Sequence, residues 1–366
     1  MKNILIESRY GDPEELTNAL SAEDFFPYKL EAEKISKRNF SDKVHLRGII
    51  EFSNLCEKDC YYCGIRNSNK QKRYCMPSEE IVKTAIDAYK QGFGSVVLQS
   101  GENRNKPFLD FVIKTISKIK KETKELDKKN KGVGITLSIG ELNKKDYEEL
   151  FQTGAHRYLM RIETSNKKLY GKLHPNDGNH SFENRLKCLK TLKEIGYQVG
   201  TGIMIGLPGQ TTEDLANDLL FFKEIDVDMV GMGPYIIHSS TPLAKKYSQW
   251  WDKNKKIIFD KSLRMISLLR ILMPDINIAS TTALQAMNPF GRELGLTYGA
   301  NIVMPNITPK KYRPLYKLYE NKLCIDEDSD KCFNCMNTRI KSVGKKPALY
   351  EWGDSKHFFG RKGATG

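Results

Sequence analysis

The stretch VHLRGIIEFSNLCEKDCYYCGIR, residues 44–66, joins a run of apolar and β-branched residues to three closely spaced cysteines. The apolar run is typical of a buried β-strand, and Cys56, Cys60 and Cys63 follow it in C-x3-C-x2-C order. Three thiolates in one loop indicate a metal site, but structural zinc sites normally use four ligands. The next cysteine, Cys75, does not follow at zinc-finger spacing. The loop therefore predicts a centre with three protein ligands and one open position.

Strand and helix signals alternate along the rest of the chain. Seven more short apolar runs are typical of buried strands, and amphipathic segments separate most of them. Residues 77–93 and 181–196 are typical of helices, with Ser78 and Ser181 as N-caps and Gly196 as a stop signal. Such alternation predicts an α/β protein, a (β/α)8 TIM-type parallel barrel. The eight predicted strands cover residues 44–52, 95–99, 134–139, 157–162, 199–206, 228–233, 276–280 and 301–305.

The chain has 366 residues, a length that fits two domains or one α/β barrel with insertions. We expect the barrel at residues 44–310, after an N-terminal helical extension at residues 1–43. A C-terminal extension at residues 311–366 carries a second group of cysteines, and we expect its last part, residues 345–366, to be a weakly ordered tail.

The composition is that of a globular protein, with 39% apolar and 28% charged residues. No stretch approaches about eighteen uninterrupted apolar residues, and the N-terminus lacks the apolar core of a signal peptide. Eight cysteines in a chain of this length are too few for a disulfide framework and indicate metal binding or catalysis in a reducing compartment. We therefore expect a cytoplasmic protein without a membrane partner.

The formal net charge is +14, and part of it comes from the Lys-rich stretch Lys114–Lys131, which is typical of an exposed helix that runs into a loop. This surface either is simply solvated or docks an acidic partner protein. A nucleic-acid partner is not expected, because neither basic–aromatic interleaving nor a recognition module is present.

Polar residues follow several predicted strands at the point where each strand ends. They are the cysteine loop, residues 100–102, Glu163, Thr281 and Thr282. In barrels of this kind the active site lies at the carboxyl ends of the strands. We therefore expect these residues to meet at one shared mouth.

The cysteine loop resembles the signature of the radical S-adenosylmethionine (SAM) superfamily, in which an aromatic residue, here Tyr62, precedes the third cysteine. The resemblance implies that Cys56, Cys60 and Cys63 hold a 4Fe–4S cluster by three of its irons. The open iron would then bind the amino and carboxylate groups of SAM. One electron from the cluster would cleave SAM to methionine and a 5′-deoxyadenosyl radical, which is chemistry that the cofactor carries.

Shorter matches to the same superfamily follow in order along the chain. The segment LQSGE resembles the element that engages the methionine amino group, and GIMIGLPGQT, residues 202–211, resembles the glycine-rich segment near the adenine. Glu163 resembles the acid that binds the ribose hydroxyls, and Arg185 resembles the arginine that pairs with the methionine carboxylate. Taken singly, Glu163 and Arg185 would be ordinary ion-pair residues. The cofactor-binding residues implied are Tyr62, Ser100, Gly101, Glu102, Ser138, Glu163 and Arg185.

Longer motifs, among them LRGIIEFSN, DMVG-x-GP, STTA and ANIVMPN-x-TP, resemble the HydE family of FeFe-hydrogenase maturases over nearly the whole chain. The resemblance implies an organometallic substrate, the iron–carbonyl–cyanide–cysteine product of a HydG-like partner. It also implies an acidic ferredoxin or a HydF-like scaffold protein as partners. Arg47 lies in a strand, where it needs an anion or carboxylate, so an ion pair with Glu51 or Glu163 is the structural alternative. The residues implied to line the substrate cavity are Arg47, Gln99, Thr136, Arg161, Thr281, Thr282 and Tyr312.

A second group of cysteines, Cys324, Cys332 and Cys335, has the spacing C-x7-C-x2-C. Metal binding is the favoured interpretation, because the acidic linker between the first two keeps the segment polar. The HydE resemblance implies a second, auxiliary iron–sulfur cluster on the surface, away from the mouth. Zinc completed by an external ligand is the alternative.

Other functions stay open from the sequence. Methylornithine synthase and biotin synthase are related radical enzymes, although no cysteine inside the second to seventh strands could hold the additional cluster of biotin synthase. A non-catalytic iron–sulfur scaffold or electron carrier is a third alternative, which Glu163 and Arg185 argue against. Cys75 and Cys188 are expected to be structural, since single buried cysteines behave as small apolar residues.

Overall fold

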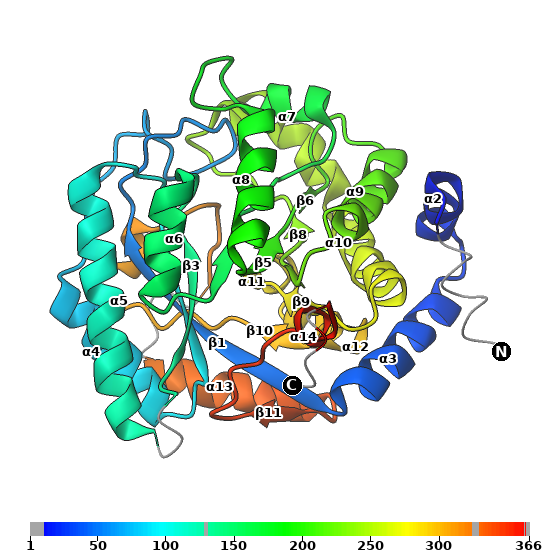
Figure 1. Cartoon of the computed structure of the whole chain (residues 1–366). Helices are drawn as coiled ribbons and strands as arrows, with labels where there is room; N and C mark the ends of the chain where they lie inside the picture. The colour runs from blue at the N-terminus through cyan, green and yellow to red at the C-terminus, as the bar shows by residue number, and fades with distance from the viewer. Residues whose placement is uncertain (1–10, 128–130, 324–328, 362, 364–366) are drawn as a thin grey trace.

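The computed structural model describes residues 11–127, 131–323, 329–361 and 363, and the side chains of 329–332 are not described. Its centre is a closed ring of parallel strands surrounded by helices (Figure 1). The ring closes because β10 pairs with β1, which confirms the predicted (β/α)8 barrel. The strands of the ring are β1 (Lys43–Ser53), β2 (Ser95–Ser100), β3 (Gly134–Ser138), β4 (Arg157–Leu159), β5 (Gln198–Thr201), β7 (Met229–Val230), β9 (Asn277–Ser280) and β10 (Ile302–Val303).

Two predicted strands are each split in the structure. Residues 199–206 form β5 and then β6 (Met204–Ile205), and the segment that begins with β7 continues as β8 (Gly233–Pro234). A Cβ atom on Gly202 would lie 2.0 Å from the carbonyl oxygen of Gly231, so the two chains approach more closely than side chains allow. Beyond this contact, β6 and β8 pair with each other and carry the chain above the barrel.

The helices follow the predicted alternation. Helix α8 begins after Ser181, whose hydroxyl accepts a hydrogen bond from the Asn184 amide, and ends at Gly196 with φ 105°, as predicted. Ser78 is the first residue of α4 and not its cap, because its hydroxyl bonds Thr115 of α5. The helices are α2 (Pro13–Ser21), α3 (Phe26–Phe40), α4 (Ser78–Lys90), α5 (Lys106–Leu126), α6 (Lys144–Gln152), α7 (Lys167–Leu173), α8 (Phe182–Ile195), α9 (Thr212–Glu224), α10 (Pro242–Leu272), α11 (Thr282–Met287), α12 (Gly291–Thr297), α13 (Ser329–Ser342) and α14 (Lys356–Arg361).

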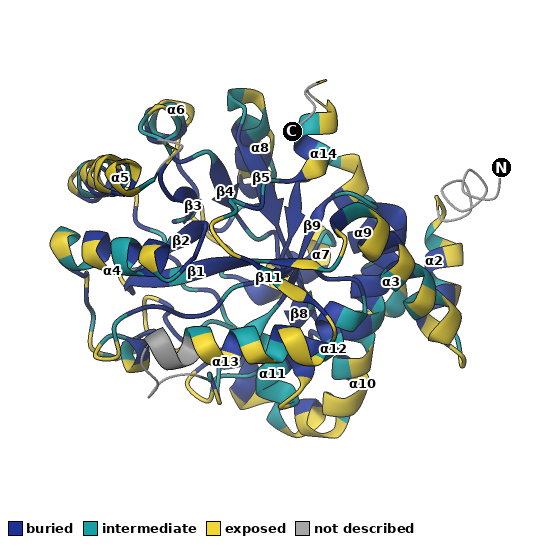
Figure 2. Ribbon diagram, turned by 90° about the horizontal axis from the view of Figure 1, so that it is seen from below, coloured by how far each residue is buried: buried dark blue, intermediate teal, exposed yellow. Residues whose placement is uncertain are grey.

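The core lies inside the ring and between the ring and its helices. Buried residues concentrate on the strands and on the inner faces of the helices, while the outer helix faces are exposed (Figure 2). Helices α2 and α3 precede β1 and pack against α9 and α10 on one side of the barrel (Figure 1). The exact domain boundaries stay a prediction. None of the helices in the described ranges is long and apolar enough to span a membrane.

Residues 345–361 pack against the barrel, so the prediction of a weakly ordered tail from residue 345 is wrong for these residues. Strand β11 (Lys346–Ala348) pairs in parallel with the start of β1. The chain then crosses the amino end of the barrel, where the carbonyl oxygen of Trp352 accepts from Arg157 at 2.7 Å and that of Gly353 accepts from Arg47 at 2.8 Å. Buried guanidinium groups need hydrogen-bond acceptors. The bonds from Arg157 and Arg47 therefore hold the C-terminal segment against the barrel.

Helix α14 is anchored by one histidine between two carboxylates. His357 lies 3.0 Å from Asp275 through Nδ1 and 2.5 Å from Asp226 through Nε2. The hydrogen bonds to Asp275 and Asp226 raise the pKa of His357 from 6.5 to about 9. The imidazolium form therefore holds the C-terminal segment against the barrel at neutral pH.

We expect His357→Gln to lower the melting temperature in a pH-dependent way. Because the pKa is raised from 6.5 to about 9 on folding, the stabilisation is fully present below pH 6.5 and is lost as the pH rises through 9. Thermal denaturation of the wild type and the variant between pH values of about 6 and about 9.5 measures this. The difference in melting temperature should be largest at the acidic end, and a difference independent of pH would contradict the assignment.

Candidate active site at the carboxyl ends of the strands

A cavity of about 330 Å³ opens at the carboxyl ends of the strands. It is lined by the cysteine loop, by the ends of the first strands and by residues after β9. Most of the residues singled out from the sequence meet here. They are Cys56, Cys60, Tyr62, Cys63, Gln99, Ser100, Gly101, Glu102, Ser138, Arg161, Glu163, Arg185, Thr281 and Thr282.

The three cysteines of the loop are free thiols that lie close to one another. Burial and the neighbouring Cys56 raise the pKa of Cys63 to about 12, and burial together with Cys63 and Cys56 raises that of Cys60. Without a cation the thiolates would repel each other, whereas a bound metal favours the thiolate form. Three soft donors without another ligand fit an iron–sulfur cluster that keeps one iron open.

Among the described residues, no three His, Cys, Asp or Glu side chains are placed to share a single metal ion. This is compatible with a cluster, because each cluster thiolate binds a different iron atom. It does not match a closed tetrahedral zinc site, which needs four ligands on one ion.

Two contacts hold the cysteine loop in place. Gly101 packs so tightly against it that a Cβ atom would lie 2.3 Å from the Leu55 carbonyl oxygen and 2.7 Å from Cys56 Cβ. Arg73 donates to the carbonyl oxygens of Asn54 and Ile65 at 2.7 and 2.8 Å. Its guanidinium group thus joins the start of the loop to its end, a positioning role that the sequence pattern did not indicate.

Four charged side chains, three of them buried and Glu102 half-buried, meet beside the loop. Lys58 Nζ lies 3.0 Å from Glu141 and 3.8 Å from Glu102, while Arg185 pairs with both carboxylates and lies 3.0 Å from Glu141. Burial alone would raise the pKa of Glu102, but Arg185 and Lys58 outweigh it and lower the pKa to about 2. The four charges sum to zero, so the cluster can stay buried.

Arg161 and Glu163 form a second ion pair at the mouth. The guanidinium Nε and NH2 groups lie 3.0 and 2.9 Å from the two carboxylate oxygens. Glu163 has φ 68°, in the left-handed region that non-glycine residues rarely adopt. Such strained residues are typical of functional sites. The backbone of Glu163 forms a β-bridge with Ile203, and its side chain lines the cavity.

Further lining residues were not indicated by the sequence. Glu51 accepts hydrogen bonds from Lys322 at 2.5 Å and from Asn306 at 3.0 Å, and Arg292 donates to Thr282 at 2.7 Å. Five cations and three carboxylates line the cavity, and Glu141, which pairs with Lys58 and Arg185, adds a fourth carboxylate, so the cations exceed the carboxylates by one. The cations are Lys58, Arg161, Arg185, Arg292 and Lys322, and the lining carboxylates are Glu51, Glu102 and Glu163.

Arg47 and Thr136 do not line this cavity. They face a separate void of about 10 Å³ near the amino ends of the strands, together with Arg157. Arg47 precedes the end of β1 at Ser53 by six residues, which corresponds to about 20 Å of extended chain. The alternative ion pairs of Arg47 are also wrong, because its hydrogen bonds go to Gly353 and Met229.

Tyr312 also lies outside the cavity. Its ring stacks on Tyr74 with centroids 5.0 Å apart. Tyr316 and Tyr319, which lie further along the same irregular segment, line the cavity in its place. The sequence carries several tyrosines in this irregular segment, and no periodicity distinguishes the one that faces inward.

The remaining cysteines differ in their surroundings. Cys188 is buried in α8 with its thiol 3.7 Å from the Leu142 carbonyl oxygen, whereas Cys75 is exposed and is not the buried residue that we expected. In the second group, Cys324 and the side chain of Cys332 lie outside the described residues, and Cys335 is exposed on α13. A second cluster therefore stays a prediction.

The model of the Radical SAM superfamily matches residues 50–222. The FeFe-hydrogenase maturase subunit HydE of Thermotoga maritima is 47% identical over 359 residues, which are 97% of this chain and 97% of the relative. The 3-methylornithine synthase of Methanosarcina acetivorans is 26% identical over 321 residues, 87% of this chain and 84% of that protein.

Two solved structures share the fold. Methylornithine synthase (PylB) superposes with a TM-score of 0.77 at 24% identity and covers 94% of this chain and 98% of its own. The maturase HydG superposes with a TM-score of 0.77 at 18% identity and covers 98% of this chain and 80% of its own. The fold is therefore shared with these proteins. The family model and the long match to the Thermotoga protein identify the chain as a radical SAM enzyme that belongs to the HydE family.

Proposed function

We propose that this enzyme acts as a HydE-type maturase in the assembly of the FeFe-hydrogenase active-site cluster. The observation that carries the proposal is one cavity that is lined by the three thiols and by five cations, which exceed the surrounding carboxylates by one. Such a cavity suits a cofactor at the thiols and a small anionic substrate beside it. The 47% identity to HydE over nearly the whole chain supports the same reading.

The residues divide the task between cofactor and substrate. When bound, the 4Fe–4S cluster and SAM supply a one-electron cleavage that yields methionine and a 5′-deoxyadenosyl radical. In our proposal Cys56, Cys60 and Cys63 ligate iron. Glu102 accepts hydrogen bonds from the SAM ammonium group, and Arg185 donates to its carboxylate.

The other cofactor residues would orient the nucleoside. The strained Glu163 carboxylate offers two acceptors for the ribose hydroxyls. Tyr62, within the cysteine loop, has its hydroxyl 3.4 Å from His174 Nε2, which restricts its ring. Ser100, Gly101 and Ser138 line the same part of the cavity.

The substrate in this proposal is an iron–carbonyl–cyanide–cysteine complex delivered by a HydG-like partner. Arg161, Arg292 and Lys322 would attract its negative charge, and Gln99, Thr281 and Thr282 would donate hydrogen bonds to it. Arg47, Thr136 and Tyr312 have no contact with this space in the structure and no longer form part of the proposal. Within the described residues, the cysteines that line the cavity are the three of the loop, which gives no support to biotin-synthase chemistry.

We further propose that the enzyme works in the cytoplasm, where a reducing environment keeps thiols and clusters intact. An acidic ferredoxin would supply electrons, and a HydF-like scaffold protein would receive the product.

The substrate proposal is tested by anaerobic reconstitution and assay of 5′-deoxyadenosine. We expect its release to rise when the purified product of a HydG-type enzyme is added, with consumption of that product. The variants Cys56→Ala, Cys60→Ala and Cys63→Ala should release none. Turnover of an amino acid in place of the organometallic complex would favour methylornithine-synthase chemistry and contradict the proposal.

Arg185→Ala and Lys58→Met should both weaken SAM binding. Loss of a charged hydrogen bond costs roughly 1.5–3 kcal/mol, which is about ten- to a hundred-fold in affinity. Equilibrium dialysis of labelled SAM against the reconstituted variants measures the loss, with iron content checked in each. Lys190→Ala, an exposed change on the same helix α8, is the matched control. Unchanged affinity in Arg185→Ala would show that the carboxylate binds elsewhere.

The second cysteine group predicts a second cluster that is not needed for SAM cleavage. The wild type should then bind up to about eight irons as two 4Fe–4S clusters. The triple variant Cys324→Ala/Cys332→Ala/Cys335→Ala should lose about half of this iron and keep SAM cleavage. Loss of cleavage with the first cluster still visible by EPR would mean that the second site takes part in catalysis.

A further inference from the structure

The outer surface of the cysteine loop differs from its buried inner side. Leu55, the residue before Cys56, leaves 36% of its surface exposed. Its carbonyl oxygen packs against Gly101, so the residue sits directly over the segment that lines the cavity. Leu55 is therefore an exposed apolar residue that directly precedes a proposed cluster ligand in the chain.

Two basic segments are held on the same surface. The Asn54 side-chain amide donates to the carbonyl oxygens of Lys72 and Leu315 at 2.9 and 2.8 Å. These bonds place residues 70–72 and 311–317 beside Leu55. A further backbone bond, from Gly64 to the carbonyl oxygen of Leu318 at 2.9 Å, joins the second segment to the end of the loop.

Three lysines of these segments are exposed and form no ion pair with any described residue. Lys70, Lys72 and Lys317 form no ion pair within the described ranges, and all three are exposed. Lys311, by contrast, is paired with Glu80 at 2.8 Å. We define the Leu55 face as Leu55, Lys70, Lys72, Tyr312 and Lys317.

Acidic residues elsewhere around the loop are already neutralised. Glu57 pairs with Arg104 at 3.1 Å, and Asp59 pairs with Arg66 at 2.5 Å.

Glu320, whose pKa is lowered by its hydrogen bonds with Ser239 and to a smaller extent by Lys317, offsets part of the Lys317 charge. Lys70 and Lys72 have no such neighbour in the described ranges, and the net charge of +14 adds to the positive potential of this surface.

We propose that the Leu55 face docks a small acidic one-electron carrier protein of the ferredoxin type. This inference rests on the proposed function, because cleavage of the SAM C5′–S bond consumes one electron. The reduced carrier loses that electron and SAM gains it, with no proton transferred. The exposed Leu55 supplies an apolar centre and the lysines supply a charged rim, the arrangement typical of transient protein interfaces.

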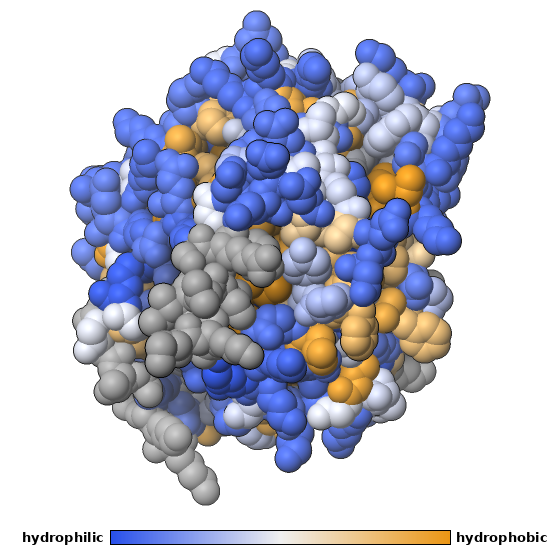
Figure 3. All heavy atoms as spheres, turned by 90° about the vertical axis from the view of Figure 1, so that its right-hand side faces the viewer, coloured by the Kyte–Doolittle hydropathy of each residue, from blue (hydrophilic) through white to orange (hydrophobic). Residues whose placement is uncertain are grey.

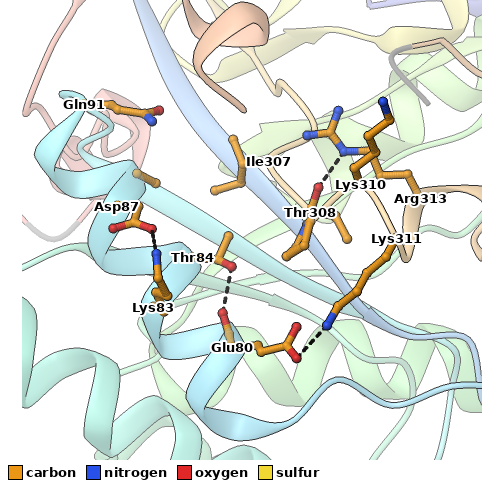
Figure 4. A pocket seen from close by; sticks show the side chains of 12 residues that line it. Glu80, Lys83, Thr84, Asp87, Gln91, Ile307, Thr308, Lys310, Lys311 and Arg313 are labelled. Atoms are coloured by element: carbon orange, nitrogen blue, oxygen red, sulfur yellow. Dashed lines mark hydrogen bonds and ion pairs between the residues drawn. The ribbon is translucent and has the colours of Figure 1, made fainter. Parts of the chain in front are cut away.

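The groove between α4 and the loop after β10 is a weaker candidate for this role. It has a volume of about 430 Å³, but two of its cations, Lys83 and Lys311, are paired with Asp87 and Glu80 (Figure 4). The Lys-rich stretch Lys114–Lys131 is also displaced from the loop. It begins within α5, a helix of 21 residues, which spans about 30 Å and runs away from the mouth (Figure 1).

Apolar side chains also show on the side of the molecule that Figure 3 faces. Exposed apolar residues outside the Leu55 face include Phe26, Ile257 and Phe290. None of these is adjacent to a residue of the cysteine loop in the chain, and nothing in the structure indicates what would cover them.

The test compares two triple charge reversals with the same change in net charge. Lys70→Glu/Lys72→Glu/Lys317→Glu alters the Leu55 face, and Lys114→Glu/Lys121→Glu/Lys124→Glu alters exposed positions of α5 as the control. Calorimetry with an acidic bacterial ferredoxin measures affinity for the full-length protein at low salt. Stopped-flow reduction by the same ferredoxin measures electron delivery to the reconstituted protein. Dithionite serves as the reductant that needs no docking.

We expect the affinity of the face variant for ferredoxin, and its rate of reduction by ferredoxin, each to be at least about tenfold lower than for the wild type. Both quantities should also depend less on salt concentration. The control variant should stay within about twofold of the wild type, as should both variants with dithionite. Equal losses in the two variants, or a loss of the face variant with dithionite as well, would overturn the proposal. Failure of the wild type to cleave SAM with dithionite would instead refute the proposed function, while ferredoxin affinity would still test the face.

Discussion

Four charged side chains from four separate segments, three of them buried and Glu102 half-buried, meet beside the cysteine loop, and the geometry of the mouth depends on them. Lys58 comes from the loop, Glu102 follows β2, Glu141 follows β3 and Arg185 lies on α8. Removing one partner of such a buried cluster leaves a charge unpaired, which typically costs about 3–5 kcal/mol. Apolar residues of the same volume would be at least as stable. This group of four charges is therefore better explained by the positions that it gives to its side chains than by a contribution to the stability of the fold.

The four charged side chains place hydrogen-bond acceptors and donors side by side. A free amino acid moiety presents an ammonium and a carboxylate group. The four charged side chains present carboxylates and cations in direct contact with each other. Because the protein charges already neutralise each other, the site is stable when empty. A zwitterion can then replace part of the internal pairing without introducing net charge into the interior.

The barrel and the limits of α8 could be predicted from sequence because their signals are local. Ser181 and Gly196 delimit α8 through contacts within a few residues, and strand periodicity needs no knowledge of the partner strand. The position of a residue along the barrel axis, by contrast, has no such local signal. Arg47 and Thr136 lie in strands that were correctly predicted, yet they face the amino end of the barrel, where the C-terminal segment supplies the acceptors. That partner is about 300 residues away in the chain, and nothing near Arg47 indicates it.

The site shows the same division between local and distant signals. The cysteine loop, Glu102 and Glu163 follow strands and could be recognised by position, whereas Lys322 and Arg292 reach the cavity from irregular or distant segments. The loop that carries the thiols is then a thin wall with two unlike faces. Its inner face is polar, buried and neutral overall, and its outer face presents Leu55 among unpaired lysines. In our proposal, a protein redox partner would approach the thiols from this outer face, so that electrons would enter without passing through the cavity.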